Sequence, residues 1–300
     1  MTTIADAAAP VEARRARFGP GALTLPAAVG LLLFFAAPLG TFFLYSFLTN
    51  SLYEVSRPFT LEAYSDALTT EVNRTLGLNS LVVGLFAAGT TVVVGLPVAY
   101  WLRFAASRLQ VLVLFLITAT LFASYLVRIY AWRSILGDNG LLNDGLRRIG
   151  LIDHPLGFLL YNKFAVTVAL VHIFLPYVVL VLYAGFRPIS PALVEAAQDL
   201  GANAFTRWRR VILPLIAAPA TTAFLLVFVL SASDYVTPQF VGGTDGALLG
   251  VRIQAALTGV GNWPLGAALS FLMLGAFLLC YVLTALALRL LRLDRIRFVS

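Results

Sequence analysis

Six long apolar segments alternate with shorter polar ones along this chain of 300 residues. They cover residues 23–48, 76–102, 109–133, 164–185, 211–233 and 264–291. Each has at least the roughly 20 residues that an α-helix needs to cross about 30 Å of hydrocarbon. The pattern therefore predicts an all-α membrane protein with six transmembrane helices, whose membrane domain extends over residues 23–291. Close helix contacts are expected in the second segment at Gly84, Gly89 and Gly95.

Composition agrees with a membrane protein. Hydrophobic residues make up 60% of the chain and charged residues only 12%, against about 25% charged residues in soluble domains. The net charge is +7, but the basic residues flank apolar segments instead of forming one surface, so no nucleic-acid partner is expected. Cys280 stands alone, and His154 and His172 are far apart in sequence. We expect no disulfide and no metal site, and we interpret His172 as a helix-packing residue.

Six spans put both termini on one side of the membrane, and the positive-inside rule identifies that side. With both termini cytoplasmic, most of the 21 basic residues fall in inner segments. These inner residues are Arg14, Arg15, Arg17, Arg103, Arg108, Arg187, Arg207, Arg209, Arg210, Arg289, Arg292, Arg295 and Arg297. We therefore predict cytoplasmic tails at residues 1–22 and 292–300. The first apolar segment exceeds the roughly 7–15 residues of a signal-peptide h-region, so we interpret it as an uncleaved span.

One polar segment, residues 186–214, interrupts the apolar second half of the chain. It reads PALVEAAQDLGANAFTRWRRVILP from Pro191 to Pro214. Ser190 suits an N-cap, Pro191 suits the first position of a helix, and Gly201 suits a helix stop that needs a positive φ. The pattern predicts a helix, a glycine break and a second helix that leads into the fifth span. One face of the first helix is expected to carry Leu193, Ala196, Ala197 and Leu200.

A short amphipathic helix outside the membrane buries its apolar face in the headgroup layer or in a partner protein. The alternative is a plain cytoplasmic loop, in which Arg207, Arg209 and Arg210 only fix the topology. The residue pattern by itself leaves these interpretations open.

Polar clusters at the outer ends of the third and fifth spans are candidates for a substrate path. The candidate residues are Tyr125, Arg128, Tyr130, Trp132, Asp234 and Tyr235. Tyr, Trp and Arg are also enriched at membrane interfaces, where they anchor helices. An acid gains little from such anchoring. Asp234 is therefore expected either to pair with Arg128 or Arg133 or to contact a cationic substrate.

The motif Glu195-Ala196-Ala197, followed by Gly201 and then by Val211-x-Leu213-Pro214, resembles the EAA loop of bacterial ABC-importer permeases. Val211 stands where the family usually has Ile. The resemblance implies that this loop is the coupling helix, which docks in a cleft of a cytoplasmic ATPase dimer. It implies a coupling role for six residues. They are Glu195, Ala196, Ala197, Gly201, Leu213 and Pro214.

Three further stretches, SYLVRIYAWRSILGDNGLLN, DYVTPQFVGG and GNWPLGAALS, resemble most the spermidine/putrescine-type permease that pairs with a second, related permease. The resemblance implies the type I ABC-importer fold in a bacterial inner membrane, with a periplasmic binding protein that delivers the solute. A polyamine is the expected solute, because aromatic faces and a carboxylate suit a cation. Opines, amino-acid derivatives and phosphonates remain open as alternatives.

ATP hydrolysis is not expected in this chain. The phosphate-binding motif GxxxxGK[ST] is absent, so we predict a non-catalytic subunit without a cofactor, whose partner ATPase uses the ATP. An ion-coupled secondary transporter would need acidic or histidine relays in mid-span, and the six spans show no such relay. A membrane scaffold would leave the coupling loop without a purpose.

Overall fold

The computed structural model describes residues 20–290, apart from residues 52–53, 57–58, 107 and 260. Within this range the regular structure is helical except for one antiparallel hairpin of β1 (Thr49–Ser51) and β2 (Glu54–Ser56). The arginines expected in the two tails lie outside the described residues. The all-α prediction is confirmed for the described part of the chain.

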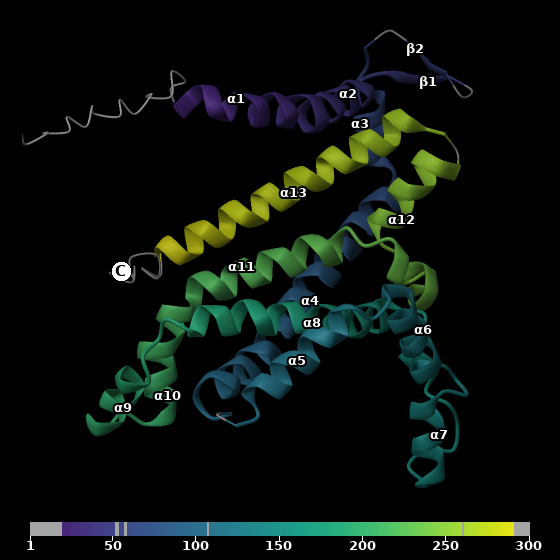
Figure 1. Ribbon diagram of the computed structural model, residues 1–300. Helices are drawn as coiled ribbons and strands as arrows, with labels where there is room; N and C mark the ends of the chain where they lie inside the picture. Colours follow the sequence, from purple (N-terminus) through teal and green to yellow (C-terminus); the bar gives the residue numbers. More distant parts are fainter. Residues whose placement is uncertain (1–19, 52–53, 57–58, 107, 260, 291–300) are drawn as a thin grey trace, which may run out of the picture.

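Three long helices form the centre of the molecule. α4 (Glu71–Phe104), α8 (Lys163–Phe186) and α11 (Leu213–Ala232) lie side by side and pack on one another (Figure 1). α4 has 34 residues, which corresponds to about 51 Å at 1.5 Å per residue, longer than the hydrocarbon layer. Ala87 of α4 and Ala169 of α8 are fully buried. Such small side chains let helix backbones approach closely, which favours helix association in lipid.

Two glycines of α4 allow especially close contacts. A Cβ at Gly84 would lie 2.8 Å from Ala232 Cβ, and a Cβ at Gly95 would lie 2.9 Å from Val178 Cγ1. These contacts confirm the prediction at both positions. The same prediction is wrong for Gly89, where no atom of another helix in the described part of the chain lies within 4 Å of the Cβ position. Five residues beyond Gly84, the helix has turned by about 140°, so Gly89 faces elsewhere.

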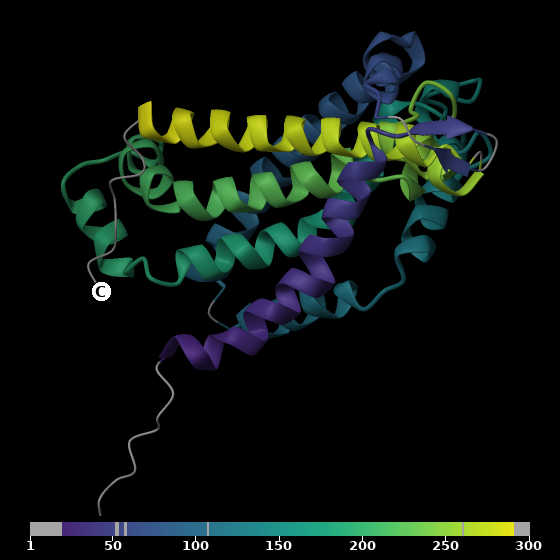
Figure 2. The same ribbon diagram turned by 90° about the horizontal axis from the view of Figure 1, so that it is seen from above.

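α13 (Trp263–Leu290) forms the next layer of the bundle. It packs on α3 (Glu62–Thr69) and α12 (Leu249–Gln254), where a smaller apolar cluster contains Ala67 and Leu269. Figure 2 shows α13, α11 and α8 as successive, roughly parallel helices.

The first apolar segment forms a helix in three parts, which are α1 (Pro20–Leu31), the π-turn η1 (Leu32–Ala36) and α2 (Ala37–Tyr45). The π-turn directly precedes Pro38, whose missing N–H disturbs the helical hydrogen bonds. α2 meets α13 through Phe43 and Phe271, whose ring centroids are 4.9 Å apart. α1 slants away from the bundle (Figure 2). The three-part helix therefore contacts the rest of the chain mainly through α2, at its C-terminal end.

The third apolar segment, predicted as one span over residues 109–133, does not form one straight helix. α5 (Gln110–Leu121) is followed by a break at residues 122–124. The chain then continues as α6 (Tyr125–Leu136) and α7 (Leu141–Arg148) at an angle of 95° to α5. Apolar composition does not reveal the break, because Ala123 and the residues around it are compatible with a continuous helix.

The two ends of the bundle carry different elements. α9 (Pro191–Asp199), α10 (Ala204–Arg207) and the π-turn η3 (Trp208–Ile212) lie at one end, which we call the α9 end (Figure 1). The start of α1 and the end of α13 lie at this same end. α6, α7 and α12 lie at the opposite end, which we call the α6 end.

Residues 234–263, which connect the predicted fifth and sixth spans, include several short helical elements. They contain η4 (Pro238–Gly242), α12 and η5 (Ala255–Gly259). Elsewhere in the chain, one more short turn, η2 (Gly157–Leu159), precedes α8. α4 supplies polar partners to residues 234–263. Asn79 Nδ2 donates to the carbonyl of Ala247 over 3.2 Å, and the N–H of Leu249 donates to Ser80 Oγ over 2.9 Å. Two polar side chains of α4 thus bond a segment that lies far away in sequence.

Five helices in the described part of the chain are long and apolar enough to cross a membrane, and the bent pair of α5 with α6–α7 is the candidate for a sixth crossing. The five are Thr24–Tyr45, Glu71–Phe104, Lys163–Phe186, Ala204–Ala232 and Trp263–Leu290. The predicted fourth and sixth spans agree with these helices to within a residue or two.

A pair of substitutions in α4 tests the packing. Gly84→Ala is expected to destabilise the protein by about 1–3 kcal/mol, because the added methyl overlaps Ala232. Gly89→Ala is expected to be neutral or stabilising by about 0.5–1 kcal/mol, because the site is open and alanine favours a helix. Thermal unfolding in detergent measures both. Equal melting temperatures for the two variants would contradict the packing described here.

Candidate functional site

The segment from α9 to α11 follows the predicted pattern of helix, glycine break and helix. Gly201 has a φ of +78°. Its N–H donates to the carbonyl of Gln198 over 2.8 Å, and the N–H of Ala202 donates to the carbonyl of Ala197 over 3.0 Å. This pair of bonds is the Schellman motif that ends a helix. The helix stop predicted at Gly201 is therefore confirmed.

The helix starts in this segment differ in how they are capped. Ser190 occupies the N-cap position of α9 and Pro191 the first helical position, as predicted, but the Ser190 side chain makes no capping hydrogen bond. Asn203 caps α10, because its Oδ1 accepts the N–H of Thr206 over 2.8 Å. Sequence reasoning did not identify Asn203, although Asn is a preferred N-cap residue.

α9 buries a single side chain, Val194, which is 6% exposed. The predicted apolar face of α9 is not buried within this chain, since Leu193 is 45% exposed and Leu200 is 89% exposed. Phe205 of α10 is 72% exposed. Glu195 and Ala196 are exposed too, and Ala197 is half-buried. The α9 end therefore presents a ridge of apolar side chains, Leu193, Leu200 and Phe205, without a partner in the described chain.

The second half of the motif forms the entry to α11. Leu213 is 42% exposed and Pro214 is half-buried, while Ile212, the last residue of η3, is fully buried. Pro214 lies at the start of α11, where its missing N–H is tolerated. The π-turn η3 precedes it directly, and such turns are frequent at functional sites.

At the α6 end, Tyr125 and Asp234 meet across 109 residues of sequence. The Tyr125 hydroxyl donates to Asp234 Oδ2 over 2.9 Å and lies 2.9 Å from Thr237 Oγ1. The Asp234 carboxylate also accepts the N–H of Val236 at 3.0 Å and that of Thr237 at 3.2 Å. Asp234 is only 9% exposed. Its hydrogen-bond partners are thus a tyrosine and two backbone amides, and neither of the two predicted arginine partners is among them.

Arg128 satisfies carbonyl groups at the helix break. Its Nη2 donates to the carbonyl of Ala123 over 3.3 Å, inside the break, and its Nη1 donates to the carbonyl of Ile173 over 3.2 Å. Ile173 lies one turn before Pro176 in α8, where the missing proline N–H disturbs the helical ladder. Arg128 therefore joins the broken span to α8.

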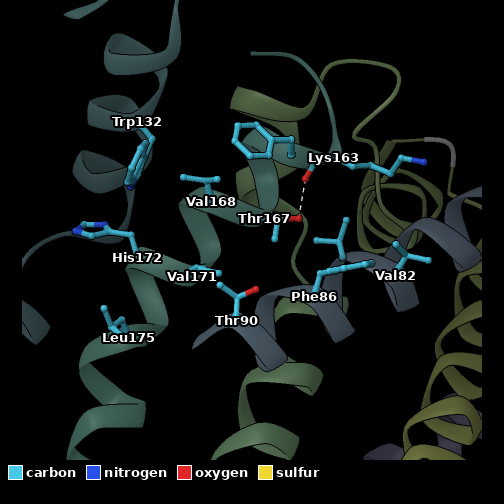
Figure 3. Close-up of a pocket in the computed structure, with 12 residues that line it drawn as sticks. Val82, Phe86, Thr90, Trp132, Lys163, Thr167, Val168, Val171, His172 and Leu175 are labelled. Atoms are coloured by element: carbon cyan, nitrogen blue, oxygen red, sulfur yellow. Dashed lines mark hydrogen bonds between the residues drawn. The ribbon is translucent and has the colours of Figure 1, made fainter. Parts of the chain in front are cut away.

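Two largely apolar cavities lie along α8 and share His172. One of about 600 Å³ is lined by Trp132, His172, Phe86 and neighbouring residues of α4 and α8 (Figure 3). The other, of about 490 Å³, is lined by Arg128, His172 and Pro176 among others. The rings of Trp132 and His172 meet edge-on, with centroids 5.5 Å apart. Figure 3 shows both rings on the same side of the first cavity.

Sequence reasoning missed His172 as a cavity residue. Its position one helical turn before Pro176, in an otherwise apolar span, was the available signal. Lys163 also lines the first cavity, and its Nζ donates to Asn79 Oδ1 over 3.2 Å. The cavities thus combine apolar walls with a few polar side chains, as solute-binding cavities do.

Of the six residues predicted for the path, only Arg128 and Trp132 line these two cavities. Tyr130 is 48% exposed and packs against Phe240, with ring centroids 5.0 Å apart. Tyr235 is 46% exposed and lines a different cavity, beside α12 and α13. The structure brings Tyr125 and Asp234 into direct contact and places Arg128 and Trp132 on the cavity walls.

Residues 80–294 match the family described as "Binding-protein-dependent transport system inner membrane component". The chain belongs to this family. It is therefore an inner-membrane permease subunit of an ABC importer, and the predicted recognition and localisation are confirmed. Subunits of this family are transport components rather than catalysts.

The permease is similar to two curated proteins of Escherichia coli (strain K12). It is 32% identical to the spermidine/putrescine transport system permease protein PotB over 230 residues, which cover 76% of this chain and 83% of PotB. It is 37% identical to the permease protein PotC of the same transport system over 81 residues, which cover 27% of this chain and 31% of PotC.

A solved structure shares the fold of the permease. It is the bacterial alginate ABC transporter in complex with alginate pentasaccharide-bound periplasmic protein, with a TM-score of 0.70. The comparison covers 90% of this chain and 94% of the other, at 16% identity. This likeness supports the ABC-importer permease fold for the present chain.

Tyr125→Phe and Asp234→Asn test the hydrogen-bond group at the α6 end. Each is expected to lower stability by about 1–3 kcal/mol, because buried partners lose their bonds. The double variant is expected to lose less than the sum of both. Tyr130→Phe is the control, since no hydrogen bond of its hydroxyl is found among the described residues. Thermal unfolding in detergent measures all four variants, and additive losses would contradict a direct bond.

Proposed function

We propose that this permease imports a polyamine, putrescine or spermidine, delivered by a periplasmic binding protein. The observation that carries the proposal is the similarity to PotB along three quarters of the chain. The match extends over both the segment of α9 and the cavities along α8. An ATP-driven importer needs a second permease half, and the partial match to PotC supports a related partner permease.

The cavity of about 600 Å³ beside Trp132 has a surface that suits a polyamine. Its walls are mostly apolar, and Trp132, Phe86 and Phe164 line it. Aromatic faces attract ammonium groups, and apolar walls accommodate the methylene chain between them. Arg128 lies on the neighbouring cavity, and its positive charge would keep the binding of a cation weak. Weak binding is what a path needs if the solute is to leave again.

In our proposal, Asp234 has a structural role beside the path and does not contact the solute. Its carboxylate oxygens already accept three hydrogen bonds, from Tyr125 and from the N–H groups of Val236 and Thr237. It holds α6 against the segment that follows α11. Aromatic side chains such as Trp132 would then provide the main attraction for the cation.

The ridge at the α9 end is proposed to dock an ATPase subunit. Leu200 and Phe205 are the most exposed apolar side chains of this segment, and an unpartnered apolar ridge beside a helix suits a groove on another protein. Glu195 would make polar contacts there, and Ala196 would allow close approach. ATP-driven closure of the ATPase dimer would push α9, and the attached helices would alternate the path between outward and inward states.

Uptake of labelled putrescine and spermidine tests the proposed substrate. Cells that lack this gene are compared with cells that carry it back. Restored uptake of either polyamine is expected. Absence of polyamine uptake would refute the substrate, and labelled opines, amino-acid derivatives and phosphonates would then be compared in the same cells, since Arg128 also suits an anion.

Two identical truncations test ATPase docking. Leu200→Ala, on the ridge, is expected to weaken co-purification of the ATPase at least about fivefold, because an interface anchor is lost. Leu141→Ala is the control, since Leu141 is similarly exposed at 74% but lies on α7 at the α6 end. The amount of ATPase retained on the tagged permease in mild detergent is the measurement. Equal retention by both variants would count against docking at this ridge.

A further inference from the structure

The C-terminal turn of α4 is bonded to the connection that leads into α9. Arg103 Nη2 donates to the carbonyl of Ile189 over 3.2 Å and to that of Arg187 over 3.5 Å. Ile189 is 1% exposed and directly precedes the N-cap of α9. The guanidinium group of Arg103 thus joins a central helix to the base of the segment proposed to dock the ATPase.

This position suits an arginine for a physical reason. The last carbonyl groups of a helix have no partner within the helix, and they carry the negative end of its dipole. α4 ends at Phe104 and α8 ends at Phe186, so Arg103 lies at the negative ends of both helices. Its side chain is half-buried, whereas Arg108 in the following turn is exposed.

Aromatic side chains surround the same junction. Tyr100 of α4 packs on Phe104 and on Trp208 of η3, with ring centroids 4.8 Å and 5.1 Å apart. Phe186, at the end of α8, lies 6.1 Å from the Phe104 ring. The Arg103 Cζ lies 5.3 Å from the centroid of the Phe104 ring. The end of α4 therefore contacts the chain on both sides of α9. It bonds the connection from α8 into α9, and it packs on η3, which follows α10.

The two kinds of contact differ mechanically. Aromatic packing is attractive, but ring pairs accept a range of offset and edge-on arrangements with centroids about 4.5–7 Å apart, so rings can slide past one another. The hydrogen bonds of Arg103 fix specific carbonyl groups, because a guanidinium group is a planar, rigid donor. If α9 is displaced, the bonds to Ile189 and Arg187 would carry α4 along, whereas the rings alone would allow slippage.

We propose that Arg103 is the positioning residue that transmits movement of the α9 segment to α4. It holds the α8–α9 connection against the end of α4, so that displacement of α9 shifts the two helices that line the cavities. This inference rests on the proposed docking of the ATPase at α9. It adds the residue through which the movement reaches the path.

The test uses the complete importer, with the partner permease, ATPase and binding protein, in proteoliposomes. Putrescine import and ATP hydrolysis are measured together for the parent and for Arg103→Ala, Arg103→Gln and Arg103→Lys. Arg108→Ala is the matched control, because it removes an exposed arginine five residues away. The readout is the number of solute molecules imported per ATP, together with the stimulation of ATP hydrolysis by the binding protein.

Arg103→Ala is expected to retain the ATPase on the permease but to lower import per ATP by about fivefold or more, the range of coupling between distant sites. Arg103→Lys is expected to lie between this variant and the parent, because its ammonium group can reach a carbonyl but lacks the planar, rigid geometry of the guanidinium group. Arg108→Ala is expected to behave as the parent does. Parental import per ATP in Arg103→Ala would overturn the proposal.

Arg103→Gln covers the possibility that the alanine variant does not assemble. Its amide keeps a donor but loses the charge and the reach, and reduced import per ATP is expected. A parental ratio in an assembled Arg103→Gln complex would overturn the proposal. If the parent imports no putrescine, the substrate proposal fails by itself. Stimulation of ATP hydrolysis by the binding protein then decides the role of Arg103, and equal stimulation in parent and Arg103→Ala would overturn it.

Discussion

Every backbone N–H and C=O group within the apolar part of a membrane needs a partner inside the protein, because no water is there to supply one. Long helices meet this need by themselves, and α4, α8, α11 and α13 do so over most of their length. The rest of this structure depends on how the requirement is met where the backbone leaves the helix. At three such places, a polar side chain supplies the missing partners.

Three places illustrate this constraint. At the break between α5 and α6, Arg128 donates to a carbonyl of the break and to one of α8. After α11, Asp234 accepts two backbone amides of the turn that follows. At the end of α8, Arg103 donates to carbonyls of the connection into α9. Each side chain both satisfies the local backbone and links two parts of the chain.

This double role connects stability with transport. Alternating access moves some helices relative to others, and the connections between helices must carry that movement without exposing unpaired backbone groups to lipid. Arginine is well suited to such joints, since its several donors can bond carbonyls from different segments. In this permease, Arg128 lies beside the cavities and Arg103 beside the proposed ATPase-docking segment. The polar residues of its spans are therefore explained first by backbone satisfaction and then by their place on the path.

The apolar periodicity of the sequence alone determined the fold class and most helix positions, because helix formation in lipid depends on local composition and length. The helix stop at Gly201 was also predictable, since a positive φ and the Schellman bonds are local properties. The break after Leu121 and the contact of His172 with both cavities were decided by tertiary structure. Tertiary structure also decided that Asp234 bonds Tyr125 of α6, which is 109 residues away in sequence. Hydrogen bonds and cavity walls of this kind join segments that only packing brings together, so no local pattern in the sequence encodes them.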